Sequence, residues 1–287
     1  MARLGRPGYH AAMLESIRPT AARSFGDLLR YWREHRRMSQ LHLAVETEIS
    51  TRHLSFIETG RAQPSREMVI RLAEHLAIPL RERNALLLAA GFAPLYRERP
   101  LDDPELSAAR QVVETVLQGH EPFPALAVDR HWQLLAANRI VPLLLTDIDP
   151  ALLQAPVNVL RLSLHPQGLA SRIVNLSQWR THLLARLRQQ VETSADPVLL
   201  ALLEELRAYP APKPTTSSTL PGAHLDVAAP LQLTSPVGLL SFISTTTVFG
   251  TPVDVTLSEL AVESFFPADL STAERLRQLQ QDLPSPC

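Results

Sequence analysis

Residues 39–60 read SQLHLAVETEISTRHLSFIETG and predict two short helices joined by a tight turn. Ser39 and Ser50 precede the two apolar runs, and a serine hydroxyl caps a helix by accepting a hydrogen bond from a free backbone N–H. The first helix is expected to end near Thr47. Gly60 is expected to end the second, because glycine takes the left-handed conformation of a helix C-terminus without strain. The residues that we expect to face inward are Leu43, Ala44, Leu54 and Ile57.

Further helices are predicted on both sides of this stretch. Before it, one apolar helix face has the spacing i, i+3, i+4, i+7: Phe25, Leu28, Leu29 and Trp32. After it, the same spacing recurs: Val69, Leu72, Ala73 and Leu76. A fifth helix is expected from about 81 to 90, where Gly91 ends it. The sequence therefore predicts an all-α five-helix domain over residues 23–93, preceded by a loose tail over 1–22.

The two parts of this 287-residue chain differ in charge. Residues 1–100 contain 16 arginines and 10 acidic residues, a balance of +6, whereas residues 101–287 have a balance of −7. Hydrophobic residues make up 45% of the chain, enough for a buried core, and the length suits about two domains. A basic part joined to an acidic part suggests a nucleic-acid-binding module linked to a module with another task.

A second domain is predicted after a linker at 94–104, which reads PLYRERPLDDP and contains three prolines and five charged residues. This domain, at 105–283, mixes helices and strands. Helices are expected at 105–118, 173–190, 196–207 and 271–281. Strands are expected at 126–128, 132–135, 231–234, 238–249, 253–258 and 259–266. Residues 209–226 are rich in proline, serine and threonine, which predicts a long flexible loop.

Several classes of protein are disfavoured by what the sequence lacks. The single cysteine, Cys287, permits no disulfide within the chain, and the ten histidines follow no metal-ligand spacing. The sequence contains no G-x-x-x-x-G-K-[ST], G-x-G-x-x-G, H-E-x-x-H or G-x-S-x-G motif. No apolar run approaches 18 residues, and the N-terminus has no signal-peptide pattern. We therefore expect a cytoplasmic protein that does not insert into a membrane, has no catalytic or metal site and requires no cofactor.

The pattern over residues 39–76 resembles the lambda-repressor-like helix–turn–helix family. In that family the second helix of the motif enters the major groove of double-stranded DNA, so the resemblance implies sequence-specific DNA binding. It also implies an ion pair inside the domain between Arg33 and Glu58.

Carried over by position, the resemblance implies individual contacts with DNA. Gln40 would bond a phosphate or brace the second helix, and Ser50 at its cap would contact a phosphate. The residues expected to face base edges are Thr51, Arg52 and Phe56, with His53 and Ser55 on the flanks. Arg52 suits this role because the guanidinium pairs with two acceptors of guanine. Phe56 departs from the polar residue often found at its position. Arg61 and Arg66 are candidates for phosphate contacts.

The order of four further segments resembles the MmyB-like regulators of bacteria. These segments are GFAPLYRERPLDDPEL (91–106), ALAVDRHWQLLAANR (125–139), VNVLRLSLHP (157–166) and IVNLSQWR (173–180). The resemblance implies a C-terminal PAS-like α/β domain with an antiparallel sheet, in an α+β multidomain protein. It also implies an apolar pocket for a long-chain fatty acid or a similar lipid.

A lipid site needs an apolar lining and a polar partner for the head group. Candidates for the lining are Trp132, Leu134, Leu143, Leu160, Leu162, Trp179, Phe242, Ile243 and Phe249. Candidates for the head group are Asn158, Arg161, His165, Asn175 and Arg180. The apolar residues could equally form an ordinary core, and the arginines could pair with surface carboxylates. A PAS-like domain could also hold haem, for which His165 is the candidate ligand.

We therefore expect a transcription regulator that binds an operator in double-stranded DNA as a homodimer and senses a small apolar ligand, such as a fatty acid. An alternative keeps the DNA-binding domain but makes the second domain a dimerisation or protein-interaction module without a ligand. An enzyme with an appended DNA-binding domain is a third class. A core filled by side chains would favour the second interpretation, and a lipid-sized cavity would favour the first.

Overall fold

The computed structural model describes residues 23–210, 230–249 and 254–281. The predicted tail at 1–22 and nearly all of the predicted loop at 209–226 lie outside these ranges. The chain divides between Glu98 and Arg99 into two compact units, inside the segment predicted to be a linker. Every helix in the described ranges is too short or too polar to span a lipid bilayer.

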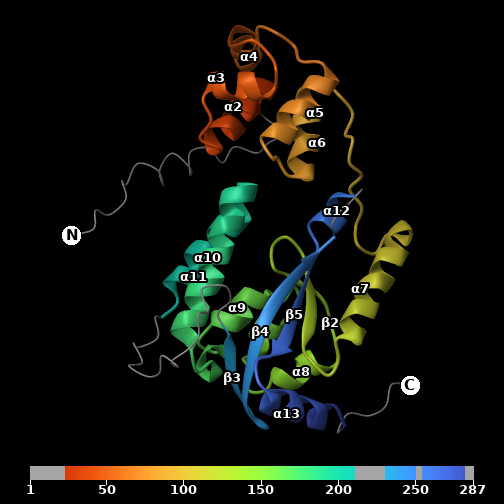
Figure 1. The fold of residues 1–287 in the computed structure, drawn as a ribbon, viewed down its shortest axis with the longest axis vertical. Coiled ribbons are helices and arrows are strands. Elements are labelled where there is room, and N and C mark those ends of the chain that lie inside the picture. The colour runs from red at the N-terminus through yellow and green to blue at the C-terminus, as the bar shows by residue number, and fades with distance from the viewer. Residues whose placement is uncertain (1–22, 211–229, 250–253, 282–287) are drawn as a thin grey trace, which may run out of the picture. The chain divides into compact units, whose positions relative to one another are not determined.

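The described part of the N-terminal unit is built from five helices, as predicted (Figure 1). They are α2 (Phe25–His35), α3 (Gln40–Glu46), α4 (Thr51–Glu58), α5 (Arg66–His75) and α6 (Leu80–Ala89). The predicted serine caps are present, since the Ser39 hydroxyl accepts from the backbone N–H of His42 at 3.1 Å. The inward faces are buried as expected, and the side chains that are almost completely buried include Leu29, Leu43, Leu54, Ile57, Leu72 and Leu76.

Two backbone features bring α2, α3 and α4 close together. Glu48 turns the chain between α3 and α4 in the left-handed conformation, at φ 56°. Gly26 of α2 touches the C-terminal end of α4, where a Cβ on Gly26 would lie 2.5 Å from the Glu58 carbonyl oxygen. Glycine at this position therefore permits the close approach of the two helices.

The C-terminal unit contains one antiparallel five-stranded sheet in the order β2-β1-β5-β4-β3. The strands are β1 (Ala125–Val128), β2 (Leu134–Ala137), β3 (Leu231–Ser235), β4 (Gly238–Val248) and β5 (Ala261–Pro267). The long connection from β2 to β3 carries α8 (Ile140–Leu144), α9 (Val159–Leu164), α10 (Leu176–Ser194) and α11 (Pro197–Ala208). The predicted α+β class with an antiparallel sheet is confirmed.

Alternation along the strands gives the sheet two different faces. On one face, Ala125, Ala127 and Val262 form a buried cluster with residues of α7 (Ser107–Gly119). The opposite face carries Leu126 and Phe265 and lies toward α8, α9 and α10. A final helix, α13 (Leu270–Gln281), contacts β4 and β5. The second face is the one that encloses a cavity.

One predicted element is wrong. Residues 253–258 were expected to form a strand because β-branched residues are dense there, but Val255–Ser258 is a short helix, α12. Asp254 caps this helix by accepting a hydrogen bond from the Thr256 N–H at 2.9 Å. The aspartate cap outweighs the local strand propensity. The strand expected at 259–266 is present as β5, and β2 begins two residues later than predicted.

Candidate functional site

The outer surface of α4 carries the polar residues predicted to read base edges. Leu54 and Ile57 are buried on the inner side of this helix, whereas the Arg52 side chain is exposed. The Arg52 guanidinium carbon lies 5.3 Å from the centre of the Phe56 ring, one turn along the helix. Phe56 can therefore support Arg52 through a cation–π contact. Thr51, His53, Ser55 and Phe56 are all partly exposed.

The C-terminal end of α4 is fixed by a buried carboxylate. The Arg33 guanidinium donates to both oxygens of Glu58, Nε to Oε1 at 2.6 Å and Nη2 to Oε2 at 3.0 Å. Gln40 Nε2 donates to Oε2 at 2.8 Å. Burial acts to raise the pKa of Glu58, but the hydrogen bonds from Arg33 and Gln40 outweigh it and lower the pKa below its ordinary value. The implied Arg33–Glu58 ion pair is thus present, and Gln40 braces α4.

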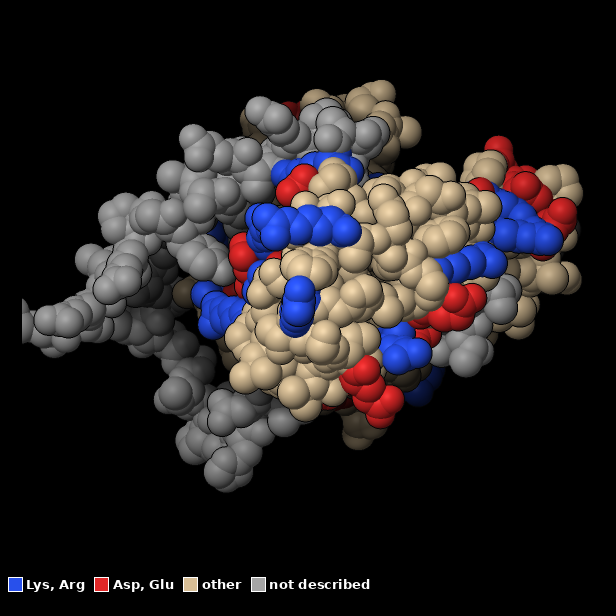
Figure 2. Space-filling view, turned by 90° about the horizontal axis from the view of Figure 1, so that it is seen from above, with Lys and Arg blue, Asp and Glu red and all other residues tan. Residues whose placement is uncertain are grey.

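Two of the remaining candidates for phosphate contacts, Ser50 and Arg61, lie at the two ends of α4, and the third, Arg66, is exposed at the start of α5. The Ser50 hydroxyl caps α4 by accepting from the His53 N–H at 3.1 Å. Arg61 follows Gly60, which ends the helix at φ 72°, and its side chain is exposed. Figure 2 shows one face of the molecule, on which arginine side chains are spread among uncharged residues rather than gathered in one block. Contacts to phosphates would therefore come from separate side chains.

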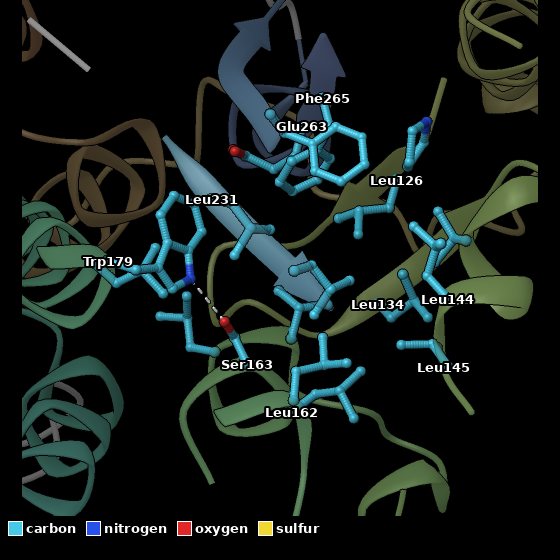
Figure 3. Close-up of a pocket in the computed structure, with 18 of the residues that line it drawn as sticks. Leu126, Leu134, Leu144, Leu145, Leu162, Ser163, Trp179, Leu231, Glu263 and Phe265 are labelled. Atoms are coloured by element: carbon cyan, nitrogen blue, oxygen red, sulfur yellow. Dashed lines mark hydrogen bonds between the residues drawn. The ribbon is translucent and has the colours of Figure 1, made fainter. Parts of the chain in front are cut away.

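An apolar cavity of about 110 Å³ lies in the C-terminal unit, between the sheet and the helices α8 to α10. One water molecule needs about 10–15 Å³ by the same measure, so the cavity could hold roughly eight. Six of the nine predicted lining residues line it, namely Trp132, Leu134, Leu160, Leu162, Trp179 and Phe242, whereas Leu143, Ile243 and Phe249 do not. Figure 3 shows leucine side chains converging on it from the sheet and from α9. Such a cavity suits a chain of methylene groups better than a polar molecule.

Both tryptophans of the cavity have hydrogen-bonded indole nitrogens. Trp179 Nε1 donates to the Ser163 hydroxyl at 2.9 Å, and Trp132 Nε1 donates to Gln190 Oε1 at 2.7 Å. Trp132 is held in the left-handed backbone conformation, at φ 64°. A bulky residue in this conformation is rare and marks a position that the surrounding structure holds firmly.

An ion pair lies in the wall of the cavity. Arg186 of α10 donates to both oxygens of Glu263 of β5, Nη1 to Oε2 at 2.9 Å and Nη2 to Oε1 at 2.6 Å. The guanidinium carbon also lies 4.6 Å from the centre of the Trp132 ring. The Glu263 side chain is only 5% exposed. Ser163, Arg186 and Glu263 were not predicted to belong to the site, since an arginine on an amphipathic helix gives no signal that a glutamate 77 residues later will face it.

Comparison with known proteins assigns the chain to a family. A family model described as the MmyB-like transcription regulator ligand binding domain matches residues 109–279. The chain belongs to the MmyB-like transcription regulators. A second model, described as a helix-turn-helix domain, matches residues 24–86. This MmyB-like regulator is therefore a DNA-binding protein with a ligand-binding domain.

Other comparisons add little about this MmyB-like regulator. No curated protein matches the chain. One similar solved structure is described as "Structure of an RNA-binding Light-Oxygen-Voltage Receptor", with 12% identity and a TM-score of 0.24. The similarity covers 98% of this chain and 69% of that one.

Three residues predicted to bind the head group of a ligand hold loops and helices of the MmyB-like domain instead. Asn158 caps α9 by accepting from the N–H groups of Leu160 and Arg161. Arg161 donates to both oxygens of Glu205 on α11, with Nη2 to Oε2 at 2.7 Å. Arg180 Nη2 donates to three backbone carbonyls at the end of α11, those of Leu206, Arg207 and Tyr209. None of the three lines the cavity, which corrects the prediction.

His165 and Phe249 also lie away from the cavity. His165 Nδ1 accepts a hydrogen bond from the Gln167 N–H at 3.1 Å, and its ring packs edge-on against Tyr209. The haem interpretation, which relied on His165 as a ligand, thus has no support from this geometry. Phe249 follows β4 and packs against the cluster on the α7 face of the sheet, with Val113 and Leu117. Phe249 is therefore apolar packing, as expected, but the prediction that it lines the cavity is wrong, because it lies on the other face of the sheet.

Proposed function

We propose that this MmyB-like regulator binds a long-chain fatty acid or a similar lipid in the cavity of its C-terminal domain, and that binding changes its affinity for an operator. The observation that carries the proposal is the apolar cavity, whose walls are leucine, valine, proline and aromatic side chains apart from Ser163 and the Arg186–Glu263 pair. Burying about twelve methylenes contributes roughly 10 kcal/mol before ordering costs, at about 0.8 each. Such a ligand needs only a weak polar anchor.

For DNA, we propose that α4 enters the major groove and that Arg52 contacts a base edge. Arg61 and the capped N-terminus at Ser50 then lie at the two ends of the helix, where they suit contacts to phosphates. A helix of eight residues reads few base pairs, which favours a homodimer on two half-sites about 34–36 Å apart. Because the matched families are regulatory, we infer that the protein is a bacterial regulator that acts in the cytoplasm and catalyses no reaction.

The ligand can regulate DNA binding only by distinguishing two arrangements of the regulator. A ligand with equal affinity for the DNA-competent and the DNA-incompetent form would shift nothing. Operator affinity must therefore differ between the ligand-loaded and the ligand-free protein. The cavity favours this function over a protein-interaction module without a ligand, for which a core filled by side chains would be expected.

Native mass spectrometry of the purified full-length protein, followed by denaturing extraction and lipid analysis, tests the ligand. We expect a stoichiometric long-chain lipid. The variant Leu134→Trp fills the cavity from β2, whereas Leu135→Trp alters the neighbouring residue, which is 38% exposed and does not line the cavity. Leu134→Trp should lose the lipid and Leu135→Trp should keep it. A wild-type protein that carries no lipid and takes up none on addition would contradict the proposal and favour the interaction module.

A further inference from the structure

The cavity that we propose for a lipid has an unusual charge balance. In the described part of the chain, Arg186 and Glu263 are the only charged residues of its lining, and they carry opposite charges. Glu263 projects from the sheet, and Ser163 projects from α9 on the other side of the cavity (Figure 3). The lining as a whole is therefore neutral and offers no free cation to a carboxylate.

Arg186 and Glu263 use their hydrogen-bonding groups on each other and on neighbouring residues. Both oxygens of Glu263 accept from Arg186, and Arg186 Nη2 also donates to the Thr246 hydroxyl on β4. The indole ring of Trp132 covers the guanidinium. A ligand carboxylate that approached Arg186 would come close to the Glu263 carboxylate in a place where water screens little of their repulsion. Two carboxyl groups that share such a site hold one proton between them.

From this geometry we propose that the cavity accepts a ligand head group only in an uncharged state. A fatty acid then binds in its neutral form, together with one proton, while an alcohol or an amide of the same length binds unchanged. The inference rests on the proposed function and adds the chemical class of the head group. The proton is taken up from solvent with the acid, stays on its carboxyl group, and is returned to solvent when the acid leaves.

The surroundings of Glu263 contain few other groups that titrate. Its neighbours across the sheet are Leu126 on β1 and Thr246 on β4, which do not ionise at neutral pH. On α10 it faces Arg186 and, one turn earlier, His182, which stacks on Trp179. Burial and the charge of Arg186 lower the pKa of His182 below its ordinary 6.5. Between pH 6.5 and 8.5 the carboxyl group of the ligand is therefore the group whose protonation should make binding depend on pH.

The test uses the full-length protein with dodecanoic acid, dodecan-1-ol and dodecanamide at pH 6.5, 7.5 and 8.5. We expect the Kd of the acid to rise about tenfold per pH unit, because its protonated fraction falls tenfold per unit, and the Kd values of the alcohol and the amide to stay within about a factor of two. In Glu263→Gln the freed Arg186 can pair with the ligand carboxylate. The acid should then bind without pH dependence and more tightly at pH 8.5 than to the wild type.

Other results would separate the two proposals. If the acid binds the wild type equally well at all three pH values, its carboxylate has displaced Glu263 and the inference is wrong. If none of the three compounds binds even at pH 6.5, the proposed lipid site itself is wrong. If Glu263→Gln does not fold, calorimetry of the wild type at pH 8.5 in phosphate and in Tris gives the proton count directly. We expect an uptake close to one proton per bound acid, and no uptake would overturn the inference.

Discussion

Glu58, the last residue of α4, has a fully buried carboxylate that Arg33 of α2 holds by two hydrogen bonds. Gln40 of α3 adds a third, and Arg30 donates to the Glu58 backbone carbonyl at 3.2 Å. Side chains from the two preceding helices thus converge on the end of the helix that we expect to read DNA. This arrangement fixes the direction of α4 relative to the rest of the domain.

Replacing Glu58 by glutamine should destabilise the DNA-binding domain strongly. The Arg33 charge would stay buried without its partner, which typically costs about 3–5 kcal/mol. Hydrogen–deuterium exchange of the full-length protein should show lost protection in α2 and α4 and unchanged protection in β4 and β5. Glu34→Gln is the matched control, because Glu34 is 63% exposed and lies 3.4 Å from the same guanidinium. Equal losses in the two variants would contradict the assigned role of Glu58.

The same pair predicts a dependence of stability on acid. The pKa of Glu58 is lower in the folded domain than its ordinary 4.5, so the unfolded chain binds a proton at a higher pH than the folded one. The stabilisation is therefore complete above about pH 4.5 and is lost as the pH falls through the lowered folded value. The difference in unfolding free energy between wild type and Glu58→Gln should shrink as the pH drops below 4.5. A constant difference down to pH 3 would argue against an ionised Glu58.

Arg52 and Arg66 should affect DNA binding differently. Arg52 lies on the outer face of α4 against Phe56, whereas Arg66 is exposed at the start of α5. Arg52→Ala should weaken binding to the operator by about 1–3 kcal/mol more than binding to unrelated DNA. Arg66→Ala should weaken both about equally and reduce the slope of log K against log salt by about 1. Equal effects of the two variants in a salt titration would remove Arg52 from the base-reading residues.

Much of the DNA-binding domain could be predicted because its signals are local. A serine cap acts on an N–H three residues away, as Ser50 does on His53, and an apolar helix face repeats within one turn. The cavity was harder to predict, because facing residues come from distant segments. Trp132 and Phe242 were expected to line it and do, but Phe249 points to the opposite face of the sheet. Which face a strand residue takes depends on the register, which composition does not reveal.

The charged residues of the cavity were even harder to predict from the sequence than its apolar lining. The cation for the head group was expected at Arg161 or Arg180, whose neighbours along the chain resembled a family motif. Both are used to hold α11, and the arginine of the cavity wall is Arg186. Its partner Glu263 comes from β5, so only the closed fold brings the two charges together. A hydrophobic pattern can predict the lining of a cavity, but an isolated buried ion pair has no signature in one sequence.

Gly26→Ala tests how closely α2 approaches α4. The new Cβ would lie 2.5 Å from the Glu58 carbonyl oxygen and 2.8 Å from that of Ile57, both of them backbone atoms that cannot turn away. The helices must separate, so we expect a loss of about 1–3 kcal/mol in the stability of this domain, as for other overpacked sites. Thermal unfolding measures it. Gly119→Ala in α7 is the control, since nothing lies within 4 Å of its Cβ position and alanine there should not destabilise the protein.

Arg161 was first expected to bind the head group of the ligand, but it should not be needed for ligand binding. Its guanidinium pairs with Glu205, and the two side chains are 41% and 36% exposed, so the pair contributes at most about 1 kcal/mol to stability. Arg161→Ala should leave the Kd of dodecan-1-ol within about twofold of wild type. The matched variant Arg186→Ala leaves the buried Glu263 carboxylate without its partner inside the cavity wall. This variant should raise the Kd of dodecan-1-ol at least about tenfold. If the two effects are reversed in a calorimetric titration, the head group lies near α11, and the cavity contacts assigned to Arg186 are wrong.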